Sequence, residues 1–292
     1  MRFITYEKNG EQHCGLLLPD GVMPLSGPGM AIVSMNQLIE RMNPDLERQI
    51  YDLAISRANL LPLADIKLMA PIPYPKRNVF CLGKNYLEHA LEIQATRISD
   101  SGIPEVPIYF TKAAAPAIGH GDPITFSPQT TGQVDYEVEL AVIIGREGTN
   151  IRREEAFEHV FGYTVVNDVT SRDLQVSHKQ WFKGKSLDTF CPMGPCIVYK
   201  DEIQPPVELS IQCRVNGELR QNSNTSNMIF DIPYIISDLS KGLTLKPGDI
   251  ICTGTPSGVG MGFNPPQYLK DKDVVECYIE NIGCLANQVR VL

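Results

Sequence analysis

The chain has 292 residues, of which 43% are hydrophobic and 21% are charged, and its formal net charge is −8 at pH 7. This composition is typical of an ordinary globular protein, and the length is sufficient for one large core. Nucleic acids and anionic membrane surfaces are recognised by basic protein faces, so the acidic balance argues against both as partners.

No segment of the sequence is typical of export or membrane insertion. The N-terminus carries charges from its second residue, and no apolar run approaches the roughly 18 residues of a membrane-spanning helix. The eight cysteines show no Cys-x-x-Cys spacing, so we expect buried reduced thiols, with disulfides or a zinc site as the alternative. The sequence therefore predicts a cytoplasmic protein without membrane contact.

Residues 1–69 are predicted to form a small N-terminal α+β domain. Two strand-like segments, Arg2–Tyr6 and Cys14–Leu18, precede an amphipathic stretch over Ser34–Leu61 whose apolar residues recur at helical spacing. A proline-rich connector follows and breaks regular structure. We place there the boundary with a larger second domain, residues 70–292.

The second domain is dominated by short runs of β-branched residues between glycines and prolines. The predicted strands are Asn78–Leu82, Ile108–Thr111, Glu137–Ile144, Gly162–Asn167, Cys196–Tyr199, Glu208–Val215, Asp249–Thr253 and Val274–Ile279. Only three segments read as helices: Tyr86–Ala95, Arg153–Glu158 and Pro233–Lys241. Because strands do not alternate regularly with helices, we expect mixed or antiparallel sheets closed on themselves.

The first predicted helix of this domain carries a histidine and a glutamate on one side. His89 and Glu92 are three residues apart and therefore neighbours on a helix surface. A carboxylate beside an imidazole raises its basicity, as a general base requires, although an incidental pair on an exposed helix is the alternative. The polar segment Thr96–Val106, which contains glycine and prolines, is predicted to be a lid over a substrate.

Two glutamates alternate along one of the predicted strands. Glu137 and Glu139 share a face, and apolar neighbours on both faces predict burial at the mouth of a core; two solvated glutamates on an edge strand are the alternative. Buried carboxylates this close would take up a proton unless a cation lies between them. Asp168, at the end of another apolar strand, supplies a third carboxylate. Such an all-oxygen set suits Mg²⁺ or Mn²⁺ and leaves coordination positions open for substrate.

Five segments, in this order, resemble the fumarylacetoacetate hydrolase family. They are Gly83–Ala90, Asp135–Glu139, Asn167–Asp173, Gly184–Pro195 and Thr253–Gly260. The resemblance implies an α+β, mostly β fold, in which mixed strands roll into a compressed barrel. It also implies a homodimer, and Mg²⁺ or Mn²⁺ bound by Glu137, Glu139 and Asp168.

The same resemblance implies roles for individual side chains. It assigns the catalytic pair to His89 and Glu92. The acylpyruvate hydrolase and oxaloacetate decarboxylase branch adds Lys185 as a catalytic cation. The residues implied around the substrate are Lys112, Arg172, Gln175 and Thr255.

Family substrates are small 2-oxo acids with a second carbonyl or carboxylate two carbons away. The leading prediction is cleavage of a carbon–carbon bond with release of pyruvate, by an oxaloacetate decarboxylase or an acylpyruvate hydrolase. The complete His–Glu pair favours cleavage over reprotonation of the same enolate by an isomerase or tautomerase. The alternatives are an isomerase or decarboxylase of hydroxy-diene diacids, of the 2-hydroxyhepta-2,4-diene-1,7-dioate isomerase type, and a metabolite-binding regulatory protein without turnover.

Overall fold

The structure, a computed structural model of the chain, describes residues 1–26, 30–57, 59–95, 102–114 and 116–292. Within this part, strands form a large mixed sheet in the order β3-β2-β1-β12-β10-β9-β15-β5-β6, with β4 beside β1. A second sheet has the order β14-β13-β16-β17-β7, and β8 and β11 form a small ladder. Most neighbours are antiparallel, while β5–β15 and β7–β17 are parallel.

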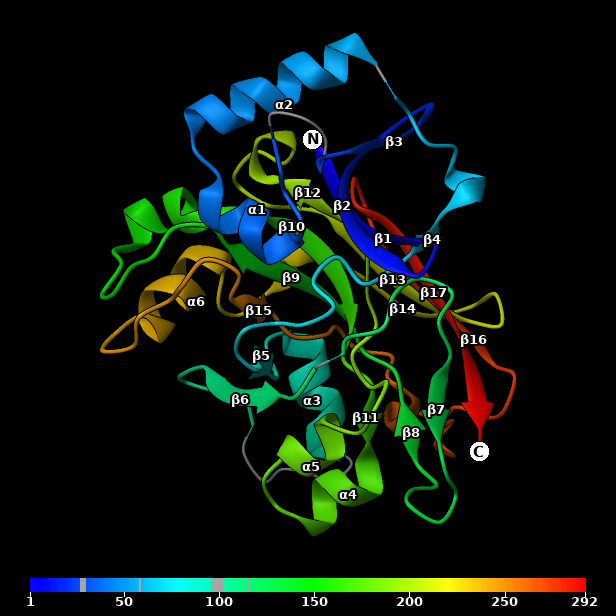
Figure 1. The fold of residues 1–292 in the computed structure, drawn as a ribbon. Coiled ribbons are helices and arrows are strands. Elements are labelled where there is room, and N and C mark those ends of the chain that lie inside the picture. Colours follow the sequence, from blue (N-terminus) through cyan, green and yellow to red (C-terminus); the bar gives the residue numbers. More distant parts are fainter. Residues whose placement is uncertain (27–29, 58, 96–101, 115) are drawn as a thin grey trace.

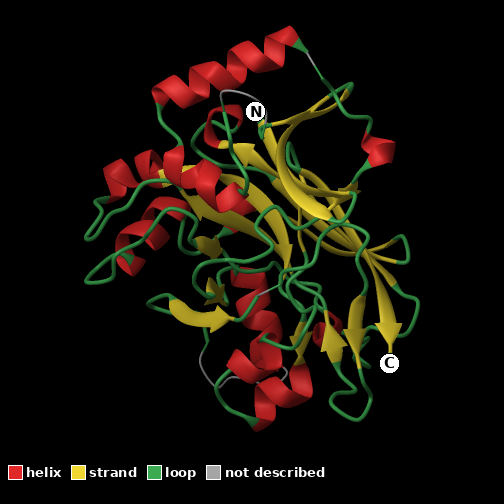
Figure 2. Cartoon of the chain, in the orientation of Figure 1, coloured by secondary structure: helices red, strands yellow, loops and turns green. Residues whose placement is uncertain are grey.

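The strands and helices alternate irregularly along the chain (Figures 1 and 2). The strands of the large sheet are β1 (Arg2–Lys8), β2 (Glu11–Leu18), β3 (Gly21–Pro24), β4 (Lys67–Leu68), β5 (Val79–Gly83), β6 (Ile108–Lys112), β9 (Val138–Ile144), β10 (Val160–Asn167), β12 (Met193–Tyr199) and β15 (Ile250–Cys252). The other strands are β7 (Ile124–Phe126), β8 (Val134–Asp135), β11 (Thr170–Ser171), β13 (Ser210–Val215), β14 (Glu218–Asn224), β16 (Val274–Ile279) and β17 (Gly283–Val291). The α-helices are α1 (Met35–Arg41), α2 (Pro44–Ser56), α3 (Leu87–Ala95), α4 (Arg172–Ser177), α5 (Phe182–Lys185) and α6 (Ile232–Leu239).

Strand β9 is buried along its whole length, as its continuous apolar run predicted. One of its faces, which carries Leu140 and Val142, packs with residues of the second sheet such as Ile211 in a core between the two sheets. The other face, which carries Ala141 and Ile143, packs in a second core with helices α1 and α2 of residues 1–69, here called the N-terminal unit. The α+β fold class predicted from the sequence is confirmed.

The N-terminal strands extend the large sheet. Strand β1 pairs with β12, with Phe3 opposite Ile197. Helices α1 and α2 lie over this end of the molecule, whereas α3, α4 and α5 lie at the other end (Figure 1). The division of the chain after residue 69 stays a prediction; in the structure the hydrogen-bonded sheet and the second core both continue across it.

The predicted amphipathic stretch over Ser34–Leu61 forms two helices. The side chain of Asn43 accepts hydrogen bonds from the N–H groups of Asp45 and Leu46, and Pro44 occupies the first turn of α2. Both features favour a helix start, so the chain restarts there rather than continuing α1.

The other helix predictions have mixed outcomes. Helices α3 and α6 form within one or two residues of the predicted bounds, but Arg153–His159 is a 3₁₀ helix rather than an α-helix. The short helices α4 and α5 were not predicted. They span six and four residues, so they hold too few apolar positions for helical periodicity to be visible in the sequence.

The cysteines are free thiols, and all but the half-buried Cys284 are buried, which agrees with the prediction of reduced cysteines. No helix in the described ranges is long and apolar enough to cross a membrane.

Candidate active site

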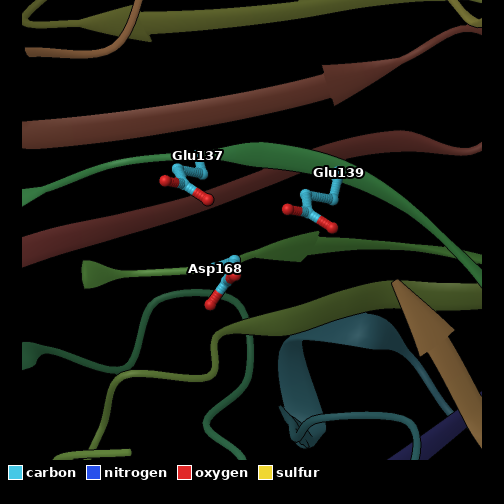
Figure 3. A group of neighbouring side chains, drawn as sticks. All are labelled: Glu137, Glu139 and Asp168. Atoms are coloured by element: carbon cyan, nitrogen blue, oxygen red, sulfur yellow. The ribbon is translucent and has the colours of Figure 1, made fainter. Parts of the chain in front are cut away.

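The pairing of β9 with β10 brings three carboxylates together. Val166 lies opposite Glu139 in this antiparallel ladder, so Asp168 leaves β10 beside Glu137. The N–H of Asp168 donates to the carbonyl of Glu137 at 2.8 Å, and the side chain of Asn167 accepts from the N–H of Glu137 at 3.0 Å. Carboxylate oxygens of Glu137, Glu139 and Asp168 lie within 4.8 Å of one another (Figure 3).

All three carboxylates are buried, with at most 4% of each residue exposed. Lys185 Nζ lies 2.7 Å from oxygens of both Glu137 and Asp168, and Arg172 Nη2 lies 2.7 Å from the second oxygen of Glu137. Burial raises the pKa of Glu137, but Lys185 and Arg172 outweigh burial and lower that pKa to about 2. Glu137 is therefore ionised despite its burial.

Glu139 has the opposite electrostatic environment. Burial, and then the charges of Asp168 and Glu137, raise the pKa of Glu139 well above its ordinary value, although the N–H of Gly254 donates to it at 2.9 Å. The nearby protein cations thus leave repulsion within the triad that a divalent cation would relieve. Three buried carboxylates with converging oxygens suit a hard cation such as Mg²⁺ or Mn²⁺.

A pocket that opens to solvent lies over the triad, with about 390 Å³ of empty space when the open solvent at its mouth is included. It is formed where α3, α4 and α5 meet the ends of the β9 and β5 segments. The predicted site residues that line it are His89, Glu137, Glu139, Arg172, Gln175, Lys185 and Thr255. Lys84, Phe110 and Trp181, none of which was predicted to belong to the site, also line it.

Helix α3 presents His89 to the pocket. His89 is 3% exposed, and its Nδ1 lies 2.9 Å from Glu92, whose other oxygen accepts from the N–H of Gly258 at 2.9 Å. A carboxylate partner at Nδ1 favours the tautomer with the proton on Nδ1, which leaves Nε2 as the acceptor that faces a substrate. The exposed, incidental pair that was the alternative interpretation is therefore not what forms. Part of the predicted lid, residues 96–101, lies outside the described residues.

Arg172 begins α4 and is held by a carboxylate that sequence reasoning missed. Asp135 accepts from Arg172 Nε at 2.9 Å and from the N–H groups of Gly260 and Met261 at 2.7 and 3.1 Å. Arg172 Nη1 also donates to Gln175 at 3.1 Å. The Asp-x-Glu-x-Glu pattern of the sequence contained Asp135, but its partners follow about 40 and 125 positions later, so spacing gave no indication of its contacts.

Lys112 lies behind the triad. It is fully buried, its Nζ lies 2.9 Å from Asp168, and it donates to the carbonyls of Val169, Lys185 and Phe190. It is absent from the pocket lining, although it was predicted to bind substrate. Its position therefore indicates that Lys112 orients Asp168 and does not contact the substrate.

Aromatic side chains and a glycine form another part of the pocket wall. Trp181 packs edge-on against Phe110 with ring centroids 5.3 Å apart, and Lys185 Nζ lies 5.2 Å from the centroid of the Phe110 ring. A Cβ atom added to Gly83 would lie 2.2 Å from the Trp181 ring, so this close approach requires glycine.

Comparisons with known proteins agree with this arrangement. Residues 78–290 match the fumarylacetoacetate (FAA) hydrolase C-terminal family. The oxaloacetate tautomerase YisK of Bacillus subtilis is 55% identical over 227 residues, which are 78% of this chain and 74% of that protein. The structure of a fumarylacetoacetate hydrolase from Exiguobacterium antarcticum is 41% identical, with a TM-score of 0.84 and all of both chains covered. Maleylpyruvate hydrolase from Sphingobium sp. SYK-6, in complex with manganese(II) and pyruvate, is 30% identical, with a TM-score of 0.78, and the match covers 100% of this chain and 99% of that one.

Proposed function

Because this chain belongs to the fumarylacetoacetate hydrolase family, we propose that it is a divalent-metal-dependent enzyme that interconverts the keto and enol forms of oxaloacetate. The observation that carries the proposal is one pocket that is lined by Glu137, Glu139, Lys185 and His89 and lies beside Asp168, the third carboxylate of the triad. A relative that shares 55% of its residues over most of the chain bears the name oxaloacetate tautomerase, which supports this choice of reaction.

The proposed metal is Mg²⁺ or Mn²⁺, held by Glu137, Glu139 and Asp168. When bound, it would polarise the 2-oxo group of the substrate and bind its neighbouring carboxylate. The burial, the all-oxygen donor set and the repulsion around Glu139 support this proposal. The manganese complex of the maleylpyruvate hydrolase, a member of the same fold, supports it as well.

The protein's own residues would move one proton between carbon and oxygen. Toward the enol, the C3–H bond of oxaloacetate breaks and His89 Nε2 takes the proton, while the electron pair moves to the 2-oxygen. The Lys185 ammonium donates a hydrogen bond to that oxygen as its charge develops. Glu92 stabilises the transient imidazolium through Nδ1 until His89 Nε2 gives the proton to the 2-oxygen, which completes the enol and restores the neutral imidazole. Arg172, Gln175 and Thr255 are proposed to orient the substrate.

Cleavage of the C3–C4 bond, the leading prediction from the sequence, is the second candidate. It develops the same negative charge at C3 and the 2-oxygen, and the maleylpyruvate hydrolase complex with pyruvate favours it. Tautomerisation ranks first because the relative of 55% identity bears the name oxaloacetate tautomerase. Hydrolysis would in addition require an attacking water, whereas decarboxylation would not. Isomerisation of hydroxy-diene diacids stays the alternative reaction. The homodimer and the cytoplasmic location stay predictions from the sequence.

The two candidates are separated by following the substrate, enol-oxaloacetate, and one product, pyruvate, in the same reaction. Enol-oxaloacetate is mixed with the Mn²⁺-loaded protein, loss of enol absorbance is followed, and pyruvate is assayed in parallel. We expect loss of the enol to be accelerated far beyond the rate of pyruvate release. His89→Asn should reduce this acceleration about 100-fold or more without weakening Mn²⁺ binding. Pyruvate formed as fast as the enol disappears would instead establish cleavage as the main reaction.

A further inference from the structure

Strand β9 loses its neighbour on one side at the point where it carries the triad glutamates. On that side it pairs with β15, which reaches no further along it than Ala141. Beyond β15, the N–H of Thr253 still donates to the carbonyl of Leu140 at 3.0 Å. The next main-chain groups on this side belong to Val138, which is fully buried between the two glutamates. Buried N–H and C=O groups need partners, so Val138 requires hydrogen bonds that β15 does not supply.

Two buried side chains take the place of the missing strand. Oε1 of Gln221, on β14, accepts from the N–H of Val138 at 3.0 Å, and the Thr255 hydroxyl donates to the Val138 carbonyl at 2.9 Å. Nε2 of Gln221 donates to the Thr255 hydroxyl at 2.7 Å and to the carbonyl of Pro256 at 2.8 Å. Because an N–H can only donate and a carbonyl can only accept, these partners fix the orientation of the amide. Val138, Gln221 and Thr255 thus form a closed ring of hydrogen bonds, here called the Gln221 ring.

The Gln221 ring joins two segments that both hold Glu139. One is β9 itself, and the other is the turn after β15, where the N–H of Gly254 donates to Glu139 at 2.9 Å. The φ of Gly254 is +95°, and a Cβ atom there would lie 2.8 Å from the side chain of Asn85, so only glycine fits in this turn. Gln221 itself is fully buried and lies outside the pocket lining. Its contribution to the site therefore passes through these two segments.

We propose that Gln221 is a positioning residue of the triad, which holds the carboxylate of Glu139 at the place where a divalent cation binds. This inference rests on the proposed function for the presence of the cation. Removal of an outer partner that orients a metal ligand typically lowers metal affinity about 10- to 100-fold. Gln221 acts from the second sheet, 83 positions after Val138, so no spacing in the sequence indicated it.

The substitution Gln221→Met tests this role, because methionine fills a similar volume without the donors and the oxygen of the amide. The matched control is Asn287→Leu, which also removes a buried amide from the second sheet, one that donates to the carbonyls of Gly119 and Asp122 outside the pocket lining. We expect Gln221→Met to lower the Mn²⁺ affinity measured by calorimetry about 10-fold or more, and Asn287→Leu to change it less than about twofold. Gln221→Glu keeps an oxygen for Val138 and should have intermediate affinity, so it also provides the test if the methionine variant does not fold.

A second measurement needs no metal. Amide hydrogen exchange of the metal-free protein, followed by NMR, reports on the hydrogen bonds that Val138 and Gly254 donate. Each rate is compared with that of the Val142 amide, farther along β9, which corrects for a general loss of stability. We expect Gln221→Met to speed exchange at Val138 and Gly254 about 10-fold or more by this comparison, and Asn287→Leu to leave both within about threefold of the wild type.

The outcomes separate the role of Gln221 from the proposed function. Wild-type Mn²⁺ affinity or unchanged exchange in Gln221→Met, or an equal loss of affinity in Asn287→Leu, would overturn the role of Gln221. A wild type that binds no Mn²⁺, with exchange altered as expected in Gln221→Met, would refute the proposed metal and leave the hold of the Gln221 ring on Glu139 standing.

Discussion

Glu139 is a triad carboxylate whose surroundings disfavour its charge. Its pKa is raised by burial and by two neighbouring carboxylates, whereas Lys185 and Arg172 hold Glu137 ionised. If the triad binds a metal, this penalty is the part of the site that the cation removes. Stability without metal and affinity for metal should therefore respond in opposite ways to neutralisation of Glu139.

The substitution Glu139→Gln tests this expectation. The variant keeps an oxygen for the N–H of Gly254 but removes the charge. We expect the Tm of the metal-free protein to stay constant or rise, and the Mn²⁺ affinity measured by calorimetry to fall at least about 100-fold. The control is Glu88→Gln, a change at an exposed position of α3. Mn²⁺ binding by Glu139→Gln as tight as that of the wild type would refute the assignment of this ligand.

The residues of the site differ in how far the sequence could predict them. Glu137 and Glu139 were found because strand alternation puts them on one face, and His89 and Glu92 because helix periodicity makes them neighbours. Lys84 could not be found this way, because its place depends on contacts of Asn85 with segments about 145 and 170 positions away.

Asp135 connects three elements of the site. It accepts hydrogen bonds from Arg172 at the start of α4 and from two N–H groups in the 260–261 turn. The nearby N–H of Gly258 in turn holds Glu92 on α3. The Asp135 carboxylate therefore fixes the position of Arg172 and the loop that orients the His–Glu pair.

We predict that Asp135→Asn lowers both stability and turnover. The amide leaves the buried Arg172 with one fewer anionic partner and opposes N–H donors with its own N–H₂ group. We expect a loss of about 2–4 kcal/mol in the free energy of unfolding, measured with urea, and a fall of about tenfold or more in kcat/KM. The matched control is Asp122→Asn, at a carboxylate outside the pocket lining. A change below about 0.5 kcal/mol with normal turnover would contradict this role.

The elements also differ in predictability. Long apolar strands such as β9 and β10 were predicted from composition and spacing because both of their faces are buried. Helices α4 and α5 were missed because their few residues are stabilised by packing against each other and against the sheet ends, not by their own periodicity. These two helices carry Arg172, Gln175 and Lys185, so the position of the substrate groups came only from the structure.

At the scale of the whole molecule, the N-terminal unit and the larger part of the chain share a core. Phe3 of β1 and Leu38 of α1 pack in one cluster with Ile197 of β12 and Ile143 of β9. Ile143 lies on the same face of β9 as the triad glutamates. The N-terminal unit therefore covers the sheet that carries the proposed metal site. The sequence, in which this unit resembled a separate domain, did not indicate this contact.

A truncated protein with residues 70–292 alone tests this dependence. It would expose the β12 edge and the apolar face of the large sheet, so we expect aggregation or a loosely packed state. Dye binding to exposed apolar surface and loss of the cooperative thermal transition would report that state. A monodisperse, cooperatively folding fragment with the turnover of the full chain would instead establish two independent domains.

The central claim is that the triad holds a divalent cation required for turnover of oxaloacetate. Its most direct test is the rate of enol-oxaloacetate loss after exhaustive chelation and after addition of Mn²⁺ or Mg²⁺ to the same sample. We expect chelation to abolish the catalysed rate, the metal to restore it in the wild type, and no restoration in Glu139→Gln. A catalysed rate that survives chelation unchanged, in a sample shown by elemental analysis to be metal-free, would contradict the claim.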